Sequence, residues 1–275
     1  MKKDDLLNLQ LLPGQVGLVY LGQVGFLIKF REKYILVDGY LSDYVDKFCC
    51  SEQVQWVRNY PAPMDPEELD FVDFVFCTHA HADHADPITL NAIARVNPKA
   101  GFFIPAPVYG QVAGLGIPEN RITPLHPDQP LTLWDGITVT PIPAAHEELH
   151  PDPNGDYPEM GYIFALDGTK VFHAGDGCPY DGLEARISGC DVMIMPINGR
   201  DYFRRYEQDI IGNFDSLEAI TLAKRAGAKL LIPVHFDLYP VNCVNPAYFV
   251  DCLQKLNPTQ RFHIFAPGEA YIFVQ

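Results

Sequence analysis

The segment at positions 78–86 reads Thr-His-Ala-His-Ala-Asp-His-Ala-Asp and gathers metal-binding side chains at close spacing. The imidazoles of His79, His81 and His84 are ligand types that zinc and related divalent metals take from proteins, as is the carboxylate of Asp83. The whole chain has 9 histidines in 275 residues, so a chance cluster of three within six positions is improbable. We therefore predict a metal site here rather than a solvated histidine-rich turn.

One loop offers too few ligands for a hydrolytic site, because each metal ion needs three or four protein ligands and keeps one position open. Later candidates are His146, Asp176 and His235. Each follows an apolar run that is typical of a β-strand, and functional residues of layered α/β proteins gather where strands end. We expect these three side chains to meet the 78–86 segment in the folded protein.

Short apolar runs rich in β-branched and aromatic residues recur along the chain and predict many strands. Several runs are apolar throughout, as expected of strands that are covered on both faces. The predicted strands are 16–20, 24–29, 33–37, 71–77, 101–104, 137–142, 161–166, 170–174, 191–197, 229–234, 261–265 and 270–274.

Longer helices are predicted from their start and stop signals. Their predicted limits are Asp86-Pro87 to Asn97, a capping box of Asp215 and Glu218 to Gly227, and Asn245-Pro246 onward. Strands that outnumber the helices favour two sheets packed face to face with the helices outside them. We expect one domain over residues 1–275.

The composition limits the class of function. The chain is 48% hydrophobic and 20% charged with a net charge of −15, which suits a globular protein but repels nucleic-acid phosphates. No apolar run approaches the ~20 residues of a spanning helix, and no signal-peptide pattern is present. The seven cysteines are an odd number with two adjacent, which fits reduced thiols. We expect a cytoplasmic protein with a small-molecule substrate and no nucleic-acid or membrane partner, and homo-oligomer formation stays open.

The ligand pattern resembles that of the metallo-β-lactamase superfamily of binuclear metallohydrolases. The residues that carry the resemblance are His79-x-His81-x-Asp83-His84, then His146, Asp176 and His235. The resemblance implies an α+β fold, namely an αββα four-layer sandwich of two mixed sheets with helices on the outer faces. It also implies that the metals lie at one edge, between the sheets.

Positions that match the family pattern take the family's roles. The implied ligands are His79, His81 and His146 for the first metal, Asp83, His84 and His235 for the second, and Asp176 as a bridge. Asp38 and Asp237 are implied as outer partners that orient the metal-binding imidazoles. Because the bridging carboxylate is a hard ligand, the two divalent ions are expected to be Mn²⁺ or Zn²⁺, with iron also compatible.

The implied chemistry is hydrolysis by a metal-bound hydroxide. Two adjacent divalent metals can share a water molecule, lower its pKa and stabilise the negative charge that develops on the substrate. Asp83 is expected to orient this nucleophile and to accept its proton. The proton for the leaving alkoxide could come from His150, Tyr157 or a metal-bound water.

Three stretches resemble more narrowly the L-ascorbate-6-phosphate lactonase group. They are His173-Ala-Gly-Asp176, Asn198-Gly-Arg200 and Ile232-Pro-Val-His235-Phe-Asp237. The guanidinium of Arg200 suits a phosphate or carboxylate, and Asn198 and Tyr202 lie beside it in the sequence. We expect these residues to bind a small anionic lactone or ester, sugar phosphates included. The alternatives are a phosphodiesterase on the same site and a non-catalytic, metal-stabilised binding module.

Overall fold

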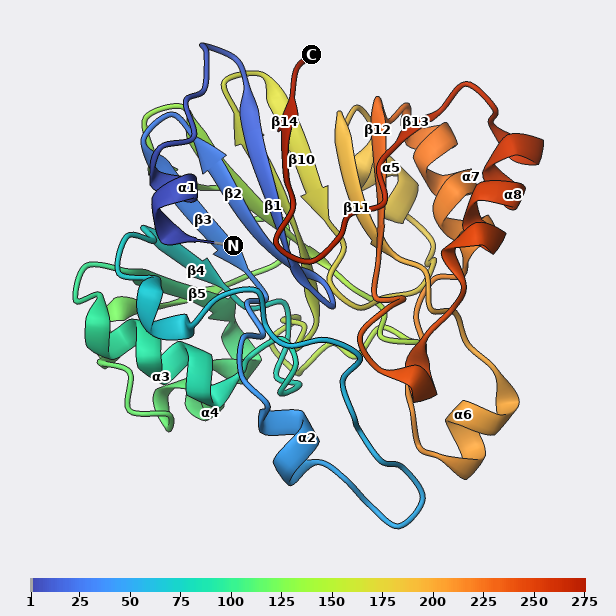
Figure 1. The fold of residues 1–275 in the computed structure, drawn as a ribbon, viewed down its shortest axis with the longest axis horizontal. Helices are drawn as coiled ribbons and strands as arrows, with labels where there is room; N and C mark the ends of the chain where they lie inside the picture. Colours follow the sequence, from blue (N-terminus) through green and yellow to red (C-terminus); the bar gives the residue numbers. More distant parts are fainter. Residues whose placement is uncertain (1) are drawn as a thin grey trace.

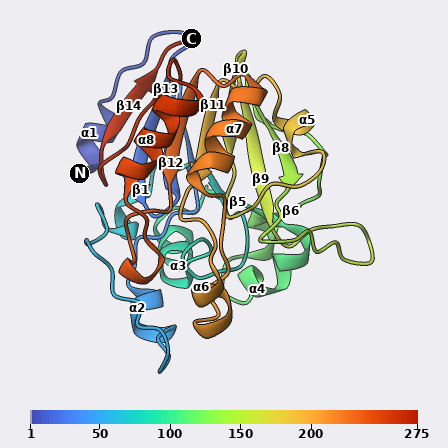
Figure 2. The same ribbon diagram turned by 90° about the vertical axis from the view of Figure 1, so that its right-hand side faces the viewer.

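The computed structural model describes residues 2–275, and over this range its strands form two mixed sheets of seven strands each (Figures 1 and 2). The first sheet contains β1 (Val16–Gly22), β2 (Gly25–Phe30), β3 (Lys33–Val37), β4 (Phe74–Phe76), β5 (Gly101–Pro105), β6 (Ile122–Leu125) and β14 (Ala270–Phe273). Its strand order is β14-β1-β2-β3-β4-β5-β6. Pairing is antiparallel from β14 to β3 and parallel from β3 to β6.

The second sheet has a matching arrangement. It contains β7 (Leu131–Trp134), β8 (Ile137–Pro143), β9 (Met160–Leu166), β10 (Thr169–His173), β11 (Val192–Pro196), β12 (Leu230–Val234) and β13 (Arg261–Phe262). Its strand order is β13-β12-β11-β10-β9-β8-β7. Pairing is parallel from β13 to β10 and antiparallel from β10 to β7. The strands β8, β10 and β12 therefore run in the same direction, and their carboxyl ends lie at one edge.

The inner faces of the two sheets pack against each other in a shared apolar core. Leu18 and Phe76 from the first sheet and Tyr162 and Ile194 from the second belong to this core, and each is at most 1% exposed. Fully burying a large apolar side chain contributes about 1.5–3 kcal/mol. This sheet-on-sheet contact therefore holds the strand ends that carry the predicted ligands in fixed positions.

Most of the helices cover the outer faces of the two sheets. The helices are α1 (Lys3–Leu7), α2 (Tyr44–Phe48), α3 (Pro87–Val96), α4 (Tyr109–Ala113), α5 (Leu183–Ile187), α6 (Tyr202–Glu207), α7 (Ser216–Ala226) and α8 (Pro246–Leu256), with 3₁₀ turns at Pro66–Glu68, Ala106–Val108, Glu119–Arg121 and Pro240–Asn242. In Figure 1, α3 and α4 lie against the first sheet, α5, α7 and α8 lie against the second, and α2 and α6 project below both. The αββα sandwich with mixed sheets is confirmed.

The three predicted helices form where their capping residues indicated. Asp86 caps α3 by accepting the N–H of Ile88 at 3.1 Å. Asp215 and Glu218 form a capping box at the start of α7, which satisfies N–H groups that the first turn leaves free. Gly227 ends this helix in the left-handed conformation, with φ of 77°.

Two edge strands and the shorter helices were not predicted. The strand β6 contains Pro124, which a strand tolerates at a sheet edge because no neighbour needs its missing N–H. The predicted strand 71–77 pairs only over β4. Helices of five or six residues are too short to show a helical period in sequence. None of the helices within residues 2–275 combines the length and the apolar character that crossing a bilayer requires.

Candidate metal centre

The predicted ligands come together at the edge where β4, β8, β10 and β12 end. The segment 78–86 forms the connection between β4 and α3, while His146, Asp176 and His235 follow the ends of β8, β10 and β12. The ligand atoms lie within 4.8 Å of one another in three overlapping groups. These groups are His79, His81 and His146; His79, His84 and Asp176; and Asp83, His84 and His235.

The first group is formed by imidazoles alone. Nε2 of His79 lies 2.9 Å from Nδ1 of His81, so the two nitrogens face the same point. The ring of His146 lies 5.2 Å from the ring of His79 and 5.1 Å from that of His81, measured between centroids. His79 and His146 are buried, whereas His81 is exposed at the rim. Three nitrogens converging in this way form one face of a tetrahedral or five-coordinate metal site.

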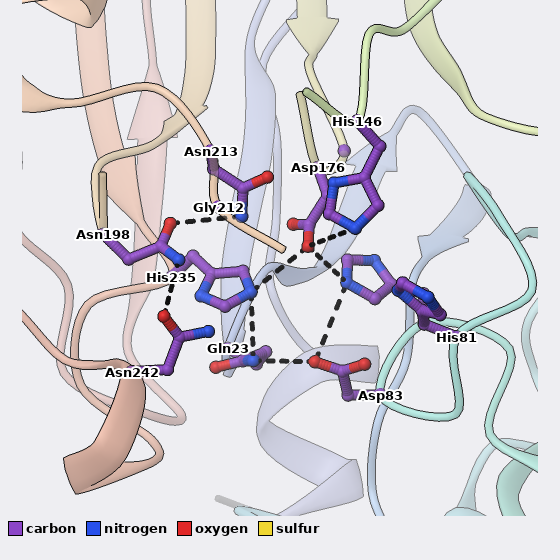
Figure 3. A network of polar contacts seen from close by, with 12 residues as sticks. Gln23, His81, Asp83, His146, Asp176, Asn198, Gly212, Asn213, His235 and Asn242 are labelled. Atoms are coloured by element: carbon purple, nitrogen blue, oxygen red, sulfur yellow. Dashed lines mark hydrogen bonds and ion pairs between the residues drawn. The ribbon is translucent and has the colours of Figure 1, made fainter. Parts of the chain in front are cut away.

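The carboxylate of Asp176 lies between two groups of candidate ligands (Figure 3). One group is His79, His81 and His146, and the other is Asp83, His84 and His235. Its Oδ2 is 3.5 Å from Nε2 of His84, 3.4 Å from Nε2 of His235 and 4.0 Å from Nε2 of His146. On the far side of His84, Oδ2 of Asp83 lies 3.8 Å from the same Nε2. One oxygen of Asp176 therefore neighbours candidate ligands from both groups.

Asp38 orients the histidine cluster from behind. Its carboxylate accepts the backbone N–H and the hydroxyl of Thr78, both at 2.7 Å, and contacts Nδ1 of His84 at 2.9 Å. The hydroxyl of Thr78 also lies 3.1 Å from Nδ1 of His79. A carboxylate that accepts the proton of Nδ1 leaves the lone pair of Nε2 directed into the site. The structure therefore shows Asp38 in the contact expected of it.

A glycine is required at position 175, which lies against Thr78. Gly175 has φ of 62°, and a Cβ atom there would lie 2.7 Å from Cβ of Thr78. Any other residue would push the turn that carries Asp176 away from Thr78. The Gly-Asp pair after β10 thus brings the shared carboxylate close to the histidines.

Buried polar atoms without partners mark the site as one that needs a cation. Over residues 2–275, Nε2 of His84 and Oδ1 of Asp176 are buried and form no hydrogen bond. Leaving a buried polar atom unsatisfied costs about 1–3 kcal/mol. Coordination of divalent metal ions would satisfy both atoms, and the nitrogen and oxygen donors fit such ions.

The electrostatics of the site favour neutral imidazoles on one side and bound positive charge on the other. Burial, with help from the neighbouring imidazoles, holds the pKa of His79 well below its usual value and lowers that of His146 to about 4. Burial also opposes the charged form of His84 and His235, but nearby carboxylates, Asp176 first, outweigh it and raise both pKa values. For Asp176, burial is outweighed by His235 and His84, and its pKa lies well below the usual range.

A cavity of about 310 Å³ opens onto the ligands. Its lining includes Val45, Trp56, Ile210 and Tyr239 beside His81, Asp83, Asp176 and His235. None of the described residues that line it is a lysine or an arginine. The space beside the ligands is therefore bounded by apolar and acidic groups.

The residues expected to bind substrate lie elsewhere. The guanidinium of Arg200 contacts the carboxylate of Glu218 at 2.6 and 2.8 Å and donates to the carbonyl of Asn213 at 2.7 Å. Asn198 donates to Oδ1 of Asn242, which lines the cavity, at 3.0 Å. The structure thus gives Arg200 a structural partner, and it places Asn198 behind the cavity rather than in its lining.

Tyr202 lies on α6, is 72% exposed and packs against Tyr206 in a tilted arrangement, with ring centroids 4.7 Å apart. It does not line the cavity either. His150, one of the groups expected to protonate the leaving alkoxide, is also exposed and lies outside the lining, as does Tyr157.

The expectation for Asp237 requires a correction. Its Oδ1 accepts the hydroxyl of Tyr20 at 3.0 Å, and Nδ1 of His235 is buried without a hydrogen-bond partner. The carboxylate therefore does not orient the imidazole of His235. It lies instead at the turn between β1 and β2, because the one proton of the same hydroxyl is shared with the carbonyl of Gln23, also at 3.0 Å.

The sequence did not predict that Gln23 would contact candidate ligands, or that apolar and aromatic side chains such as Trp56 and Tyr239 would form one wall of the cavity. Gln23 lies in the Gly-Gln-Val turn after β1, is 2% exposed, and contacts Asp83 and His235 (Figure 3). A polar residue between two apolar strands was the available signal. Trp56 and Tyr239 form part of the wall, with ring centroids 5.2 Å apart.

Comparisons with known proteins agree with this fold. A family model described as "Beta-lactamase superfamily domain" matches residues 33–236. A "UPF0173 metal-dependent hydrolase" of Aeropyrum pernix is 28% identical, and the match covers 93% of this chain and 97% of that protein. Igni18 from Ignicoccus hospitalis, titled a novel metallo hydrolase, superposes with a TM-score of 0.70 at 21% identity, covering 94% of this chain and 98% of that one. A possible metal-dependent hydrolase from Veillonella parvula superposes with a TM-score of 0.75 at 19% identity, covering 94% and 99%.

Proposed function

This chain belongs to the family described as "Beta-lactamase superfamily domain". From this membership and the geometry of the site, we propose that the protein is a hydrolase of a small ester or lactone and that it uses two divalent metal ions. The observation that carries the proposal is the shared oxygen of Asp176, within 4.0 Å of ligand nitrogens from both groups. The curated relative from Aeropyrum pernix is named a metal-dependent hydrolase, which supports the same reaction class.

Bound metal ions would supply a hydroxide at neutral pH and a Lewis acid for the reacting carbonyl. The protein's own groups complete the chemistry. Burial opposes the ionised form of Asp83, but His84 outweighs it and the pKa of this carboxyl lies below its usual value. Asp83 is therefore an anion, as a group that orients the attacking oxygen must be, and its place in the ligand motif supports a role as the acceptor of that oxygen's proton. The donors are nitrogen and oxygen only, which suits Mn²⁺, Zn²⁺ and iron.

The cavity favours a substrate without negative charge. Beyond the bound metal ions, an anionic group would lie beside Asp83 and Asp209 and would find no lysine or arginine in the lining. The nearby arginines are paired with acids, Arg200 with Glu218 and Arg205 with Glu147 at 2.9 Å. Apolar side chains such as Trp56 instead suit an uncharged substituent. We therefore revise the expected sugar phosphate to an uncharged ester or lactone with an apolar group.

A panel of substrates tests the reaction class. Chelator-treated protein is reconstituted with Mn²⁺ or Zn²⁺ and assayed on an aryl ester, a lactone, a phosphodiester and a phosphomonoester. The proposal expects metal-dependent hydrolysis of the ester or lactone, with little activity on either phosphate. Turnover of the phosphodiester alone would establish the phosphodiesterase alternative. Metal binding without turnover of any substrate would instead favour the binding module.

A further inference from the structure

We propose that Gln23 is an additional ligand of the metal ion held by Asp83, His84 and His235, through its side-chain oxygen. The inference rests on the metal site of the proposed function and deepens it. It concerns a residue from the turn between β1 and β2, which lies far along the chain from the ligand motif.

The end of the Gln23 side chain occupies a ligand position. Its terminal nitrogen lies 2.8 Å from Oδ2 of Asp83 and 3.2 Å from Nε2 of His235. The side chain is buried and points into the site from the side opposite Asp176 (Figure 3). Its contacts with Asp83 and His235 are the hydrogen-bond-length contacts that join these two residues.

These contacts close a ring of five polar atoms around one point. The successive separations are 3.8 Å from Asp83 Oδ2 to His84 Nε2, 3.5 Å to Asp176 Oδ2, 3.4 Å to His235 Nε2, 3.2 Å to the Gln23 terminus and 2.8 Å back to Asp83. Two atoms bonded to one ion at about 2.1 Å lie roughly 3.0–3.4 Å apart when their bond angle is between a right angle and the tetrahedral value. Two of the five separations, 3.4 and 3.2 Å, fall in this interval, and the other three depart from it by at most 0.4 Å. Small shifts of these side chains on metal binding would therefore bring all five atoms to ligand distances, and Gln23 fills the gap between Asp83 and His235.

The chemistry of the carboxamide decides which of its atoms faces the ion. In the structure, its N–H donates to the carboxylate of Asp83. An N–H group cannot bind a cation, whereas the amide oxygen is a neutral hard ligand. A half-turn about the terminal bond exchanges the two atoms and places Oε1 at the ligand position. This rotation leaves the rest of the side chain unmoved.

The backbone of Gln23 is held to the strand end that carries His235. Its carbonyl accepts the N–H of His235 at 2.8 Å, and its own N–H donates to the hydroxyl of Tyr60 at 3.3 Å. Gln23 and His235 both have φ of 57°. The turn and the strand end are thus fixed relative to each other before a metal binds, which lowers the cost of coordination.

A competing role is that of a hydrogen-bond donor that positions Asp83. The two roles respond differently to substitution. In Gln23→Glu, a carboxylate can coordinate the metal but cannot donate to Asp83 and repels it. In Gln23→Asn, the side chain is one methylene shorter and reaches neither position, and asparagine tolerates a positive φ well.

Metal titration of the full chain separates these roles. Metal-free wild type, Gln23→Asn and Gln23→Glu are titrated with Zn²⁺ against a chromophoric chelator. We expect wild type to bind two equivalents, Gln23→Asn to bind one of them about 10–100-fold more weakly, and Gln23→Glu to retain both affinities within severalfold. Gln260→Asn is the matched control, because this buried glutamine donates to the carbonyls of Ala228 and Arg261 instead. It should leave both metal affinities unchanged.

Three results would overturn the inference. Equal affinities in Gln23→Asn and wild type would show that the residue is not a ligand. A loss in Gln23→Glu as large as that in Gln23→Asn would assign it the donor role. Wild type that binds both ions but hydrolyses nothing would refute the proposed function and leave the Gln23 result valid. Wild type without a second equivalent would overturn both.

Discussion

Asp38 contacts Nδ1 of His84 at 2.9 Å through an oxygen that also accepts the hydroxyl of Thr78. The two residues are far apart in sequence, and both side chains are completely buried. This contact connects the end of β3 to the metal-binding loop and sets which nitrogen of His84 faces the ligands. Substituting Asp38 tests how strongly its contact with His84 controls the affinity for metal.

We expect Asp38→Asn to lower the affinity for metal by about 10–100-fold, because a neutral amide does not increase the basicity of His84 as a carboxylate does. Competition titration with Zn²⁺ measures the change. Asp191→Asn is the control. Asp191 is also buried and accepts the backbone N–H of Lys170 at 2.8 Å, but it lies at the start of β11, at the opposite end of the strands from the candidate ligands. An equal loss of affinity in both variants would mean that general destabilisation is the cause.

The two groups of ligands should be separable by stoichiometry. We expect His146→Ala and His235→Ala each to lose about one of the two metal equivalents, because each removes a ligand of only one group. Elemental analysis after dialysis gives the count. His263→Ala should keep both equivalents, since this imidazole is paired with Glu269 at 2.8 Å. Full occupancy in His235→Ala would contradict the second site.

Asp83 should matter for turnover more than for the fold. We expect Asp83→Asn to reduce kcat by about 10²–10⁴-fold, the range typical of a lost general base. Asp209→Asn is the comparison, because Asp209 lines the same cavity and its carboxylate contacts the guanidinium of Arg205 at 3.2 Å rather than a candidate ligand. Steady-state kinetics of metal-loaded enzyme, with a thermal melt for each variant, give the answer. Near-normal kcat in Asp83→Asn would assign proton transfer to another group.

Arg200 should act on stability rather than on substrate binding. We expect Arg200→Ala to lower the free energy of unfolding by about 1–2 kcal/mol, through loss of the two contacts with Glu218, and to leave KM nearly unchanged. Burial opposes ionisation of Glu218, but Arg200 and a backbone N–H outweigh it and lower its pKa. The contribution is therefore present above the usual carboxyl pKa and is lost as the pH falls through the lowered value.

Urea unfolding at neutral and acidic pH measures this difference, which should shrink in acid. Arg200→Lys should recover only part of it, because an ammonium group cannot form the planar pair of bonds. A selective rise in KM for a phosphorylated substrate would restore the substrate-binding role that the sequence suggested.

Trp56 should select the apolar part of the substrate. We expect Trp56→Ala to raise KM for an ester with an apolar substituent by about 10–100-fold, because a lost aromatic contact removes about 1–3 kcal/mol of binding. A short-chain ester should be affected much less. Trp134→Ala is the control, since this second tryptophan lies on β7, remote from the cavity. Equal effects on both esters would place the substrate elsewhere in the cavity.

Local patterns in the sequence were sufficient to predict several parts of this protein. The loop 78–86 supplies four ligand side chains at close spacing, so it identifies a metal site without knowledge of distant contacts. The caps of α3 and α7 depend on residues three apart or less, and both helices begin where those residues predicted. The remaining candidate ligands follow predicted strands. They meet in the structure because β8, β10 and β12 run in the same direction, so their carboxyl ends lie at one edge.

Only the tertiary structure decided which residues complete and surround the site. Gln23 and His235 are 212 positions apart, and Tyr20 and Asp237 are 217 apart, so no local pattern pairs them. Arg200 resembled a substrate-binding residue until its partner, Glu218, was placed beside it by the start of α7. Short-range periodicity reports the conformation of each element, whereas the contacts between elements depend on how two sheets pack. That packing brings the turn at Gln23 against the end of β12, and the guanidinium of Arg200 is held by Glu218 outside the lining of the cavity.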